Sequence, residues 1–297
     1  MMTGRLILVL RWSFFAAILG AGVVLAIRHR DQLAALETQW RVLLPLVVAS
    51  TIAMALRGVA QQTMAAAFGV RLTLWEGMGL SAFTTVLGET LPLNAATLTK
   101  PVYLKRVHGL DYASCGVGLT VSAIIYTGAA CLLAATVMVT IEGMPLLAPA
   151  LMMAVAIGAW SLILVPAKPY GGLSRIAIPL SRIAVARIQW SLWVQFLLLA
   201  FVDGIRLWLA FVFVGFDPGV MTALAAAGLA TLAAWLALTP GALGIVETTL
   251  WAAAALLHYE ATAAVAASLV ARAGVIGSAM AIAALWLTTA RLTKCRQ

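Results

Sequence analysis

Five ionisable side chains interrupt stretches of the sequence that are otherwise apolar, and these residues are the first candidates for chemistry. They are Glu89, Asp203, Arg206, Glu247 and Arg272. If such stretches lie in a bilayer, each charge at the bilayer centre costs at least about 2.5 to 3.5 kcal/mol unless it is paired or hydrated. The five residues therefore predict ion pairs, ligand contacts or proton relays rather than a surface that faces lipid.

Two of these charges have a partner nearby in the sequence and one does not. Asp203 and Arg206 are three residues apart, so they share a face of a helix and can neutralise each other. A local ion pair that faces the helical bundle and a role in transport explain this pair equally well. Arg272 has no acidic residue within helical reach, and we expect it to pair with Glu247. Released from Glu247, its guanidinium is suited to binding a lipid phosphate.

Two short segments combine helix-breaking residues with a glutamate. Residues 88–94 read GETLPLN and contain Pro92 and Asn94. Residues 239–247 read TPGALGIVE and contain Pro240, Gly241 and Gly244. Proline removes a backbone donor and glycine relaxes the backbone dihedrals, so both segments free backbone polar groups. A helix that restarts after Gly244 would direct free N–H groups at an anionic headgroup; two ordinary prolines in interfacial loops are an equally good interpretation.

The composition is typical of a membrane protein. Hydrophobic residues make up 64% of the 297 residues and charged residues only 10%, against about 45–50% and 25% in soluble domains. At about 20 residues for each crossing, the chain supplies about six to eight membrane elements. No stretch is polar enough for a separate soluble domain. We therefore expect one transmembrane domain over residues 1–297, with halves of about 1–143 and 144–297.

The predicted fold class is all-α, a polytopic helical bundle of about six full spans and two re-entrant hairpins. The full spans are expected at 6–27, 42–56, 116–140, 146–165, 190–215 and 261–287. The stretches 72–99 and 220–257 contain the two helix-breaking segments. Basic residues in short loops favour the cytoplasmic side, which places both termini there. The six spans then close consistently only if each of the two stretches enters and leaves on the same side, the first from the cytoplasm and the second from outside, as in inverted-repeat transporters. If both stretches instead cross twice, the total is ten crossings.

The remaining composition argues against several functional classes. The net charge of +9 comes from basic residues between apolar runs, which favours contact with anionic lipid rather than nucleic acid. The three cysteines have no CxxC spacing and the three histidines are scattered, so no metal or cofactor is expected. No triad, P-loop or HExxH motif is present, and the protein is not expected to be an enzyme.

The motif PGALGIVE at 240–247, followed about 25 residues later by Arg272, resembles the lysylphosphatidylglycerol synthase transmembrane family, also called flippase-like. The segment that ends in Arg57 resembles the arginine-bearing segment of that family, and residues 91–100 resemble its first conserved hairpin. In this hairpin only Pro92 and the basic end at Lys100 match the family pattern. The resemblance implies a bacterial or archaeal cytoplasmic-membrane protein that moves lipids between leaflets, here without the soluble aminoacyltransferase domain of some members.

The function that we expect is transfer of an anionic phospholipid or a polyprenyl-linked lipid between leaflets. Arg57, Lys100 and Arg272 would attract the phosphate, while Glu89 and Glu247 would counter or relay charge. The expected partners are membrane lipids, a separate lipid-modifying enzyme or glycosyltransferase, and a second copy of the chain in a homodimer. Two alternatives stay open: an intramembrane enzyme that uses Glu89 or Glu247 as a base on a lipid headgroup, and a scaffold subunit whose charges are simply paired.

Overall fold

A computed structural model describes residues 40–90, 98–164, 186–234, 242 and 244–294. The chain divides into two compact units, Met1–Leu44 and Pro45–Gln297. Only residues 40–44 of the first unit are among those described, and all other described residues belong to the second unit. The predicted span at 6–27 lies outside the described residues.

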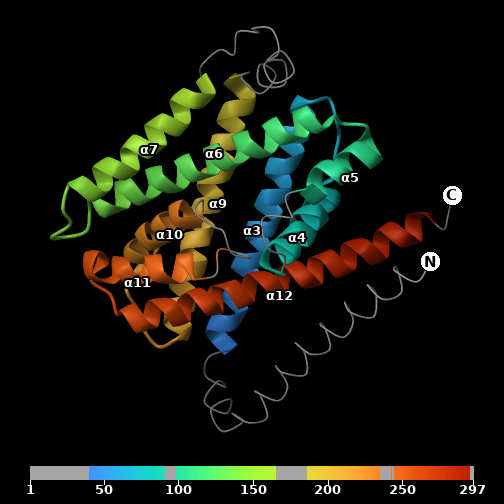
Figure 1. The fold of residues 1–297 in the computed structure, drawn as a ribbon. Coiled ribbons are helices and arrows are strands. Elements are labelled where there is room, and N and C mark those ends of the chain that lie inside the picture. Colours follow the sequence, from blue (N-terminus) through green and yellow to red (C-terminus); the bar gives the residue numbers. More distant parts are fainter. Residues whose placement is uncertain (1–39, 91–97, 165–185, 235–241, 243, 295–297) are drawn as a thin grey trace. The chain divides into compact units, whose positions relative to one another are not determined.

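The described residues are helical and contain no strand, which confirms the all-α prediction. Their helices are α3 (Trp40–Ala67), α4 (Leu74–Thr90), α5 (Thr99–His108), α6 (Tyr112–Met138), α7 (Leu147–Leu164), α9 (Ala186–Phe213), α10 (Val220–Ala234), α11 (Ile245–Leu257) and α12 (Ala261–Lys294). Helix α6 packs along α7 and also contacts α9 and α10, while α12 packs against α4, α9 and α11 (Figure 1). Thus α6 and α12 are the two helices around which the others are arranged.

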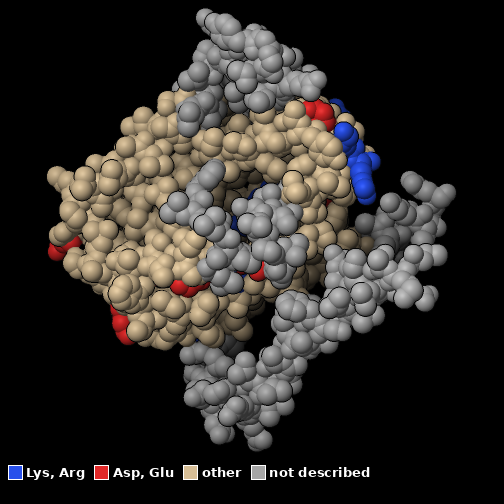
Figure 2. All heavy atoms as spheres, in the orientation of Figure 1, with Lys and Arg blue, Asp and Glu red and all other residues tan. Residues whose placement is uncertain are grey.

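Four described helices are long and apolar enough to cross a membrane. The segments that meet this criterion are Arg41–Ala67, Tyr112–Met138, Arg187–Phe213 and Ala261–Thr289. They correspond to four of the six predicted full spans. The span predicted at 146–165 forms α7, whose apolar part is shorter. Large exposed apolar side chains such as Ile52, Leu198 and Leu269 lie on these helices, and most of the described surface in Figure 2 carries no charge, as a lipid-facing surface requires.

Helix α3 extends well beyond the predicted span at 42–56. The prediction stopped where Arg57, Gln61 and Gln62 interrupt the apolar pattern. In the structure these polar side chains have partners inside the protein. Gln62 donates from Nε2 to the carbonyl of Leu72 at 2.9 Å, and Gln61 accepts a hydrogen bond from Ser81 at 3.4 Å. The helix therefore continues to Ala67 because its polar residues face the bundle rather than water.

Both stretches predicted as hairpins are interrupted helices. The first contains α4, which ends at Thr90, and the next described helix, α5, begins at Thr99, where the predicted stretch ended. The second stretch contains α10 and α11, which pack against each other. The residues between the helices lie outside the described part, and the predicted entry from opposite faces stays a prediction.

The start of α6 illustrates how the short connections are fixed. Asp111 is the N-cap, and its carboxylate accepts hydrogen bonds from the hydroxyl and the backbone N–H of Ser114 at 2.7 and 2.9 Å. These hydrogen bonds lower the pKa of the Asp111 carboxyl below its ordinary value. An N-cap of this kind satisfies backbone donors that the helix itself cannot. The long central helix therefore begins at a defined residue directly after α5.

Close packing of α6 on α10 depends on a glycine in α10. A Cβ atom at Gly228 would lie 2.4 Å from Ala134 Cβ and 3.0 Å from the carbonyl oxygen of Ala130. Neither atom can move without moving the backbone of α6. We expect Gly228→Ala to separate the two helices and to lower the free energy of unfolding by about 1–3 kcal/mol.

Thermal unfolding of the purified protein in detergent measures this effect. Gly158→Ala on α7 is the matched control, because no neighbouring atom lies within 4 Å of its Cβ position. Alanine favours a helix over glycine by about 1 kcal/mol, so the control should be as stable as the parent protein or more so. Equal stability of both variants would show that α6 and α10 do not pack as closely as these distances require.

Candidate functional site

The centre of the site is the ion-paired side chain of Arg272 on α12. Its Nη1 atom lies 2.6 Å from Glu89 Oε2, and its Nη2 atom lies 3.1 Å from Glu247 Oε1. Only 14% of the Arg272 side chain is exposed, with 20% of Glu89 and 11% of Glu247. The expected Arg272–Glu247 pair is thus confirmed, and Glu89 at the end of α4 is a second partner that the sequence did not indicate. One arginine therefore connects the two interrupted stretches to the final long helix.

The position of Glu247 follows from the restart of the helix after Gly244. Helix α11 begins at Ile245, as predicted, and Gly244 has φ 85°, a conformation that favours glycine. Its N–H donates to Glu247 Oε2 at 2.7 Å. The helix start thus holds an anion, as expected of such a site, but that anion is the protein's own carboxylate. Because its two oxygens contact Gly244 and Arg272, Glu247 joins α11 to α12.

A second charged cluster is centred on Asp203 in α9. Its Oδ1 atom lies 3.0 Å from Arg206 Nη1, and its Oδ2 atom lies 3.5 Å from Arg57 Nη2 on α3. Tyr126 on α6 donates its hydroxyl to Oδ2 at 2.6 Å. The predicted Asp203–Arg206 pair is confirmed, whereas the contacts of Asp203 with Arg57 and Tyr126 were not foreseen. Among the described residues, Arg206 Nε has no hydrogen-bond partner.

Residues of both charged clusters, all except Glu247, line one cavity, which we call the central chamber. Its volume is about 540 Å³, within the range of about 300–1,000 Å³ that is usual for ligand pockets. Charged side chains on its wall are accompanied by the hydroxyl groups of Thr85, Thr231 and Ser268 and by small apolar residues of α10 and α12. Figure 2 shows a hollow in the drawn face, with basic side-chain atoms visible inside it. A polar cavity is therefore present within a bundle whose outside is apolar.

The charges in the central chamber are separated into two groups of opposite sign. Asp203 is shared by two arginines, so this cluster has a formal charge of +1. Arg272 is shared by two glutamates, so the other cluster has a formal charge of −1. The six ionised groups of the two clusters thus sum to zero, and the five that line the chamber, all except Glu247, sum to +1. An anionic group would be attracted to the Asp203 cluster and would compete with Glu89 and Glu247 for Arg272.

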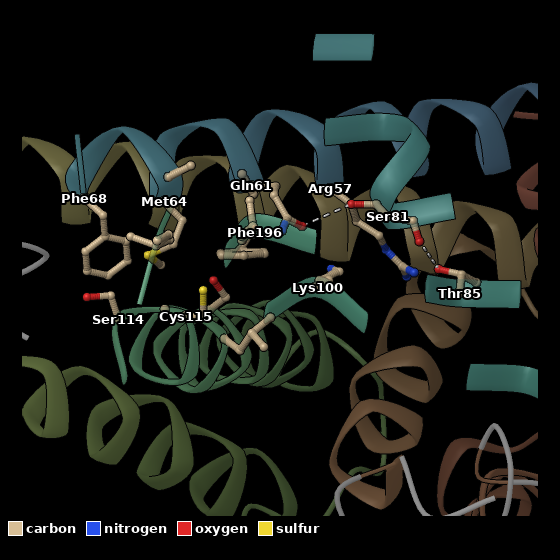
Figure 3. A pocket seen from close by; sticks show the side chains of 17 residues that line it. Arg57, Gln61, Met64, Phe68, Ser81, Thr85, Lys100, Ser114, Cys115 and Phe196 are labelled. Carbon is tan, nitrogen blue, oxygen red and sulfur yellow. Dashed lines mark hydrogen bonds between the residues drawn. The ribbon is translucent and has the colours of Figure 1, made fainter. Parts of the chain in front are cut away.

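A smaller cavity adjoins the central chamber, and Arg57 and Thr85 line both of them. We call it the Lys100 cavity; its volume is about 160 Å³. Lys100 comes from the first turn of α5, and Figure 3 shows its side chain beside Arg57, Ser81 and Thr85. The predicted basic residues Arg57 and Lys100 are therefore brought together, but in this cavity rather than around Arg272.

Four of the predicted site residues cannot be placed. Pro92, Asn94, Pro240 and Gly241 lie outside the described residues. The structure adds Tyr126, Thr85 and Ser268, which the sequence analysis missed because hydroxyl groups in apolar helices carry no distinctive pattern. Within the described ranges no group of histidine, cysteine or acidic residues is arranged to hold a metal ion.

Comparison with models of protein families assigns the chain to a family. The model of the family described as "Lysylphosphatidylglycerol synthase TM region" matches residues 6–283. The chain belongs to this family. Searches of curated proteins and of solved structures found no match.

Family membership accounts for the apolar spans and for the two interrupted stretches. The family match covers the described spans and both interrupted stretches, so the protein is a multi-pass membrane protein. As a member of this family, it acts in lipid metabolism or lipid transport. The central chamber and the Lys100 cavity are lined by charged side chains within the described part of this membrane domain.

Proposed function

We propose that the protein is a translocase that moves an anionic lipid between the leaflets of a bacterial or archaeal cytoplasmic membrane. The observation that carries this proposal is the arrangement around Arg272: one buried arginine, held by a glutamate from each interrupted stretch, faces a cavity of about 540 Å³. A headgroup that crosses the bilayer needs such a polar path, because hydrocarbon does not solvate charge.

The charge pattern supports a phosphate-bearing lipid, either a phospholipid or a polyprenyl-linked lipid. Arginine binds phosphate through paired hydrogen bonds, and an incoming phosphate can replace one carboxylate on the guanidinium. Arg57 and Arg206 offer a second position on the opposite cluster, where one carboxylate serves two arginines. The headgroup would therefore move between positively charged positions without any one of them holding it permanently.

An enzymatic function is less well supported by the same geometry. The residues expected to serve as a general base are Glu89 and Glu247, and both are ion-paired to Arg272. In these ion pairs one oxygen of each carboxylate contacts the guanidinium of Arg272 instead of a reacting group. We propose instead that a separate enzyme or glycosyltransferase makes or uses the lipid. A scaffold without a site is disfavoured by the volume of the central chamber.

Reconstitution into vesicles that contain a fluorescently labelled phosphatidylglycerol tests the translocase proposal. Labelled lipid that reaches the outer leaflet is destroyed by a membrane-impermeant reductant, so the rate of its loss reports transfer. We expect Arg272→Ala and Glu247→Ala to reduce this rate at least about tenfold, which corresponds to one lost charge-assisted hydrogen bond in the rate-limiting state.

Arg187→Gln is the matched control, since Arg187 is exposed at the start of α9 and lines neither cavity. This variant should transfer lipid at the parent rate. An unchanged rate in both Arg272→Ala and Glu247→Ala would contradict a role of these residues in lipid transfer. Chemical change of the lipid, detected by mass spectrometry after incubation, would favour the enzymatic alternative.

A further inference from the structure

The Lys100 cavity is chemically different from the central chamber that it adjoins. Arg57 and Lys100 are the charged groups among its described lining residues, and no carboxylate is among them. Gln61, Ser81 and Thr85 add polar groups at the same end, as Figure 3 shows. The other end is lined mainly by apolar side chains such as Met64 and Phe68, with the hydroxyl group of Ser114 beside them. The cavity therefore has one basic end that can donate hydrogen bonds and one end suited to hydrocarbon.

No carboxylate among the described residues that line the cavity neutralises the positive charge at its basic end. Lys100 has no ion pair or hydrogen bond among the described residues, and its charge and that of Arg57 repel each other. Arg57 does contact Asp203, but this carboxylate is also paired with Arg206. The Asp203 cluster thus contributes a formal charge of +1, and Lys100 adds another. A ligand with two negative charges would neutralise this region, whereas one with a single charge would leave it positive.

The volume limits which part of a lipid can enter. A cavity of on the order of 150 Å³ accommodates a molecule of the size of benzene, and the Lys100 cavity is similar at about 160 Å³. A bare phosphate with the first few carbon atoms of its chain fits this space. A phosphodiester with a further glycerol or sugar on the phosphate would have to extend beyond this cavity, for example into the adjoining central chamber.

We propose that the Lys100 cavity is a binding site for a terminal phosphate monoester carried by a lipid. A monoester carries about −1.5 to −2 charge at pH 7 and three acceptor oxygens, whereas a phosphodiester carries a single charge. Lys100 and Arg57 bind the phosphate, and Met64 and Phe68 contact the start of the chain. The hydroxyl groups of Ser81 and Thr85, which now donate to Gln61 and to the carbonyl of Ser81, turn to donate to the phosphate instead. This inference deepens the proposed function, on which it rests, by naming the substrate class.

The shared wall gives this site a place in the transfer. Arg57 and Thr85 line both cavities, so a phosphate bound by Lys100 can keep its contact with Arg57 while it enters the central chamber. Arg57 is also the arginine with the longer distance to Asp203, 3.5 Å against 3.0 Å for Arg206. If Arg57 exchanges the Asp203 carboxylate for a phosphate, the longer of the two ion pairs is broken and the Asp203–Arg206 pair is kept.

Binding to the purified full-length protein in detergent tests the site without measuring transport. The probes are phosphatidic acid, which has a terminal monoester, and phosphatidylglycerol with the same acyl chains. Affinity is read from the ligand-dependent rise in unfolding temperature and from native mass spectrometry. We expect phosphatidic acid to bind at least about tenfold more tightly than phosphatidylglycerol, as one additional charge-assisted hydrogen bond would give.

Variants of α5 locate the binding. Lys100→Gln should reduce the affinity for phosphatidic acid about tenfold and abolish the preference over phosphatidylglycerol, and Lys100→Arg should retain both. Lys105→Gln is the matched control, because Lys105 is exposed on the same helix and stacks over Tyr112 instead of lining the cavity. Unfolding temperatures without lipid verify that each variant is folded. If Lys100→Gln does not fold, the affinities of the parent protein for the two lipids still test the inference, because phosphatidic acid must bind more tightly.

Inorganic phosphate, tested alone, distinguishes the source of the monoester. Binding of phosphatidic acid without binding of millimolar phosphate supports a lipid ligand. Equally tight binding of free phosphate overturns the assignment to a lipid. Equal affinity for the two lipids, or a preference unaffected by Lys100→Gln, overturns the inference even if lipid transfer occurs. Conversely, a Lys100-dependent preference in a protein that transfers no lipid supports the site and contradicts the translocase proposal.

Discussion

Replacement of Arg272 by methionine is expected to lower the free energy of unfolding by about 3–5 kcal/mol, because it leaves two buried carboxylates without their partner. Glu89 and Glu247 both contact the guanidinium and both are largely buried. Thermal unfolding of the purified variant in detergent measures the effect.

A compensated variant separates the charge from the shape of the side chain. Arg272→Met combined with Glu89→Gln and Glu247→Gln removes the uncompensated charges while keeping similar volumes. We expect it to recover most of the stability, since a neutral replacement of a buried ion pair is often tolerated. It should still fail to transfer lipid, because no guanidinium remains for the phosphate. Full transfer by this variant would contradict a binding role of Arg272.

Replacement of Asp203 by asparagine is expected to have the second-largest effect. The variant leaves Arg57 and Arg206 close together without an anion, and the loss of stability should again be about 3–5 kcal/mol. The same change removes the carboxylate that competes with phosphate for Arg57. Anionic lipid should therefore raise the unfolding temperature of Asp203→Asn more than that of the parent protein.

Two further measurements define this prediction. Arg206→Met in the Asp203→Asn background should restore part of the stability, because it removes one of the two uncompensated charges. Asp217→Asn is the matched control, since Asp217 lies at an exposed turn and accepts a hydrogen bond from Trp208 outside both cavities. If anionic lipid stabilises Asp203→Asn less than the parent protein, phosphate does not bind at Arg57.

Features of the protein that depend on local chemistry were predictable from the sequence. The apolar composition specifies a membrane helical bundle, because water-exposed folds cannot bury so much apolar surface. The restart of a helix after Gly244 follows from glycine and its neighbours, and it is observed at Ile245. The Asp203–Arg206 pair follows from the helical repeat, which places residues three apart on one face. Arg272 and Glu247 are only 25 residues apart and lie on consecutive helices.

Only the tertiary structure decided which distant charges meet. Glu89 and Arg272 are 183 residues apart in the sequence, and their contact exists because α12 packs along α4. Arg57 meets Asp203 because α3 continues past the end of its apolar pattern. Hydrophobic periodicity fixes the face of each helix but not the neighbour that it packs against. The sequence by itself therefore determined the class of fold and the residues that must be paired, whereas helix packing selected their partners.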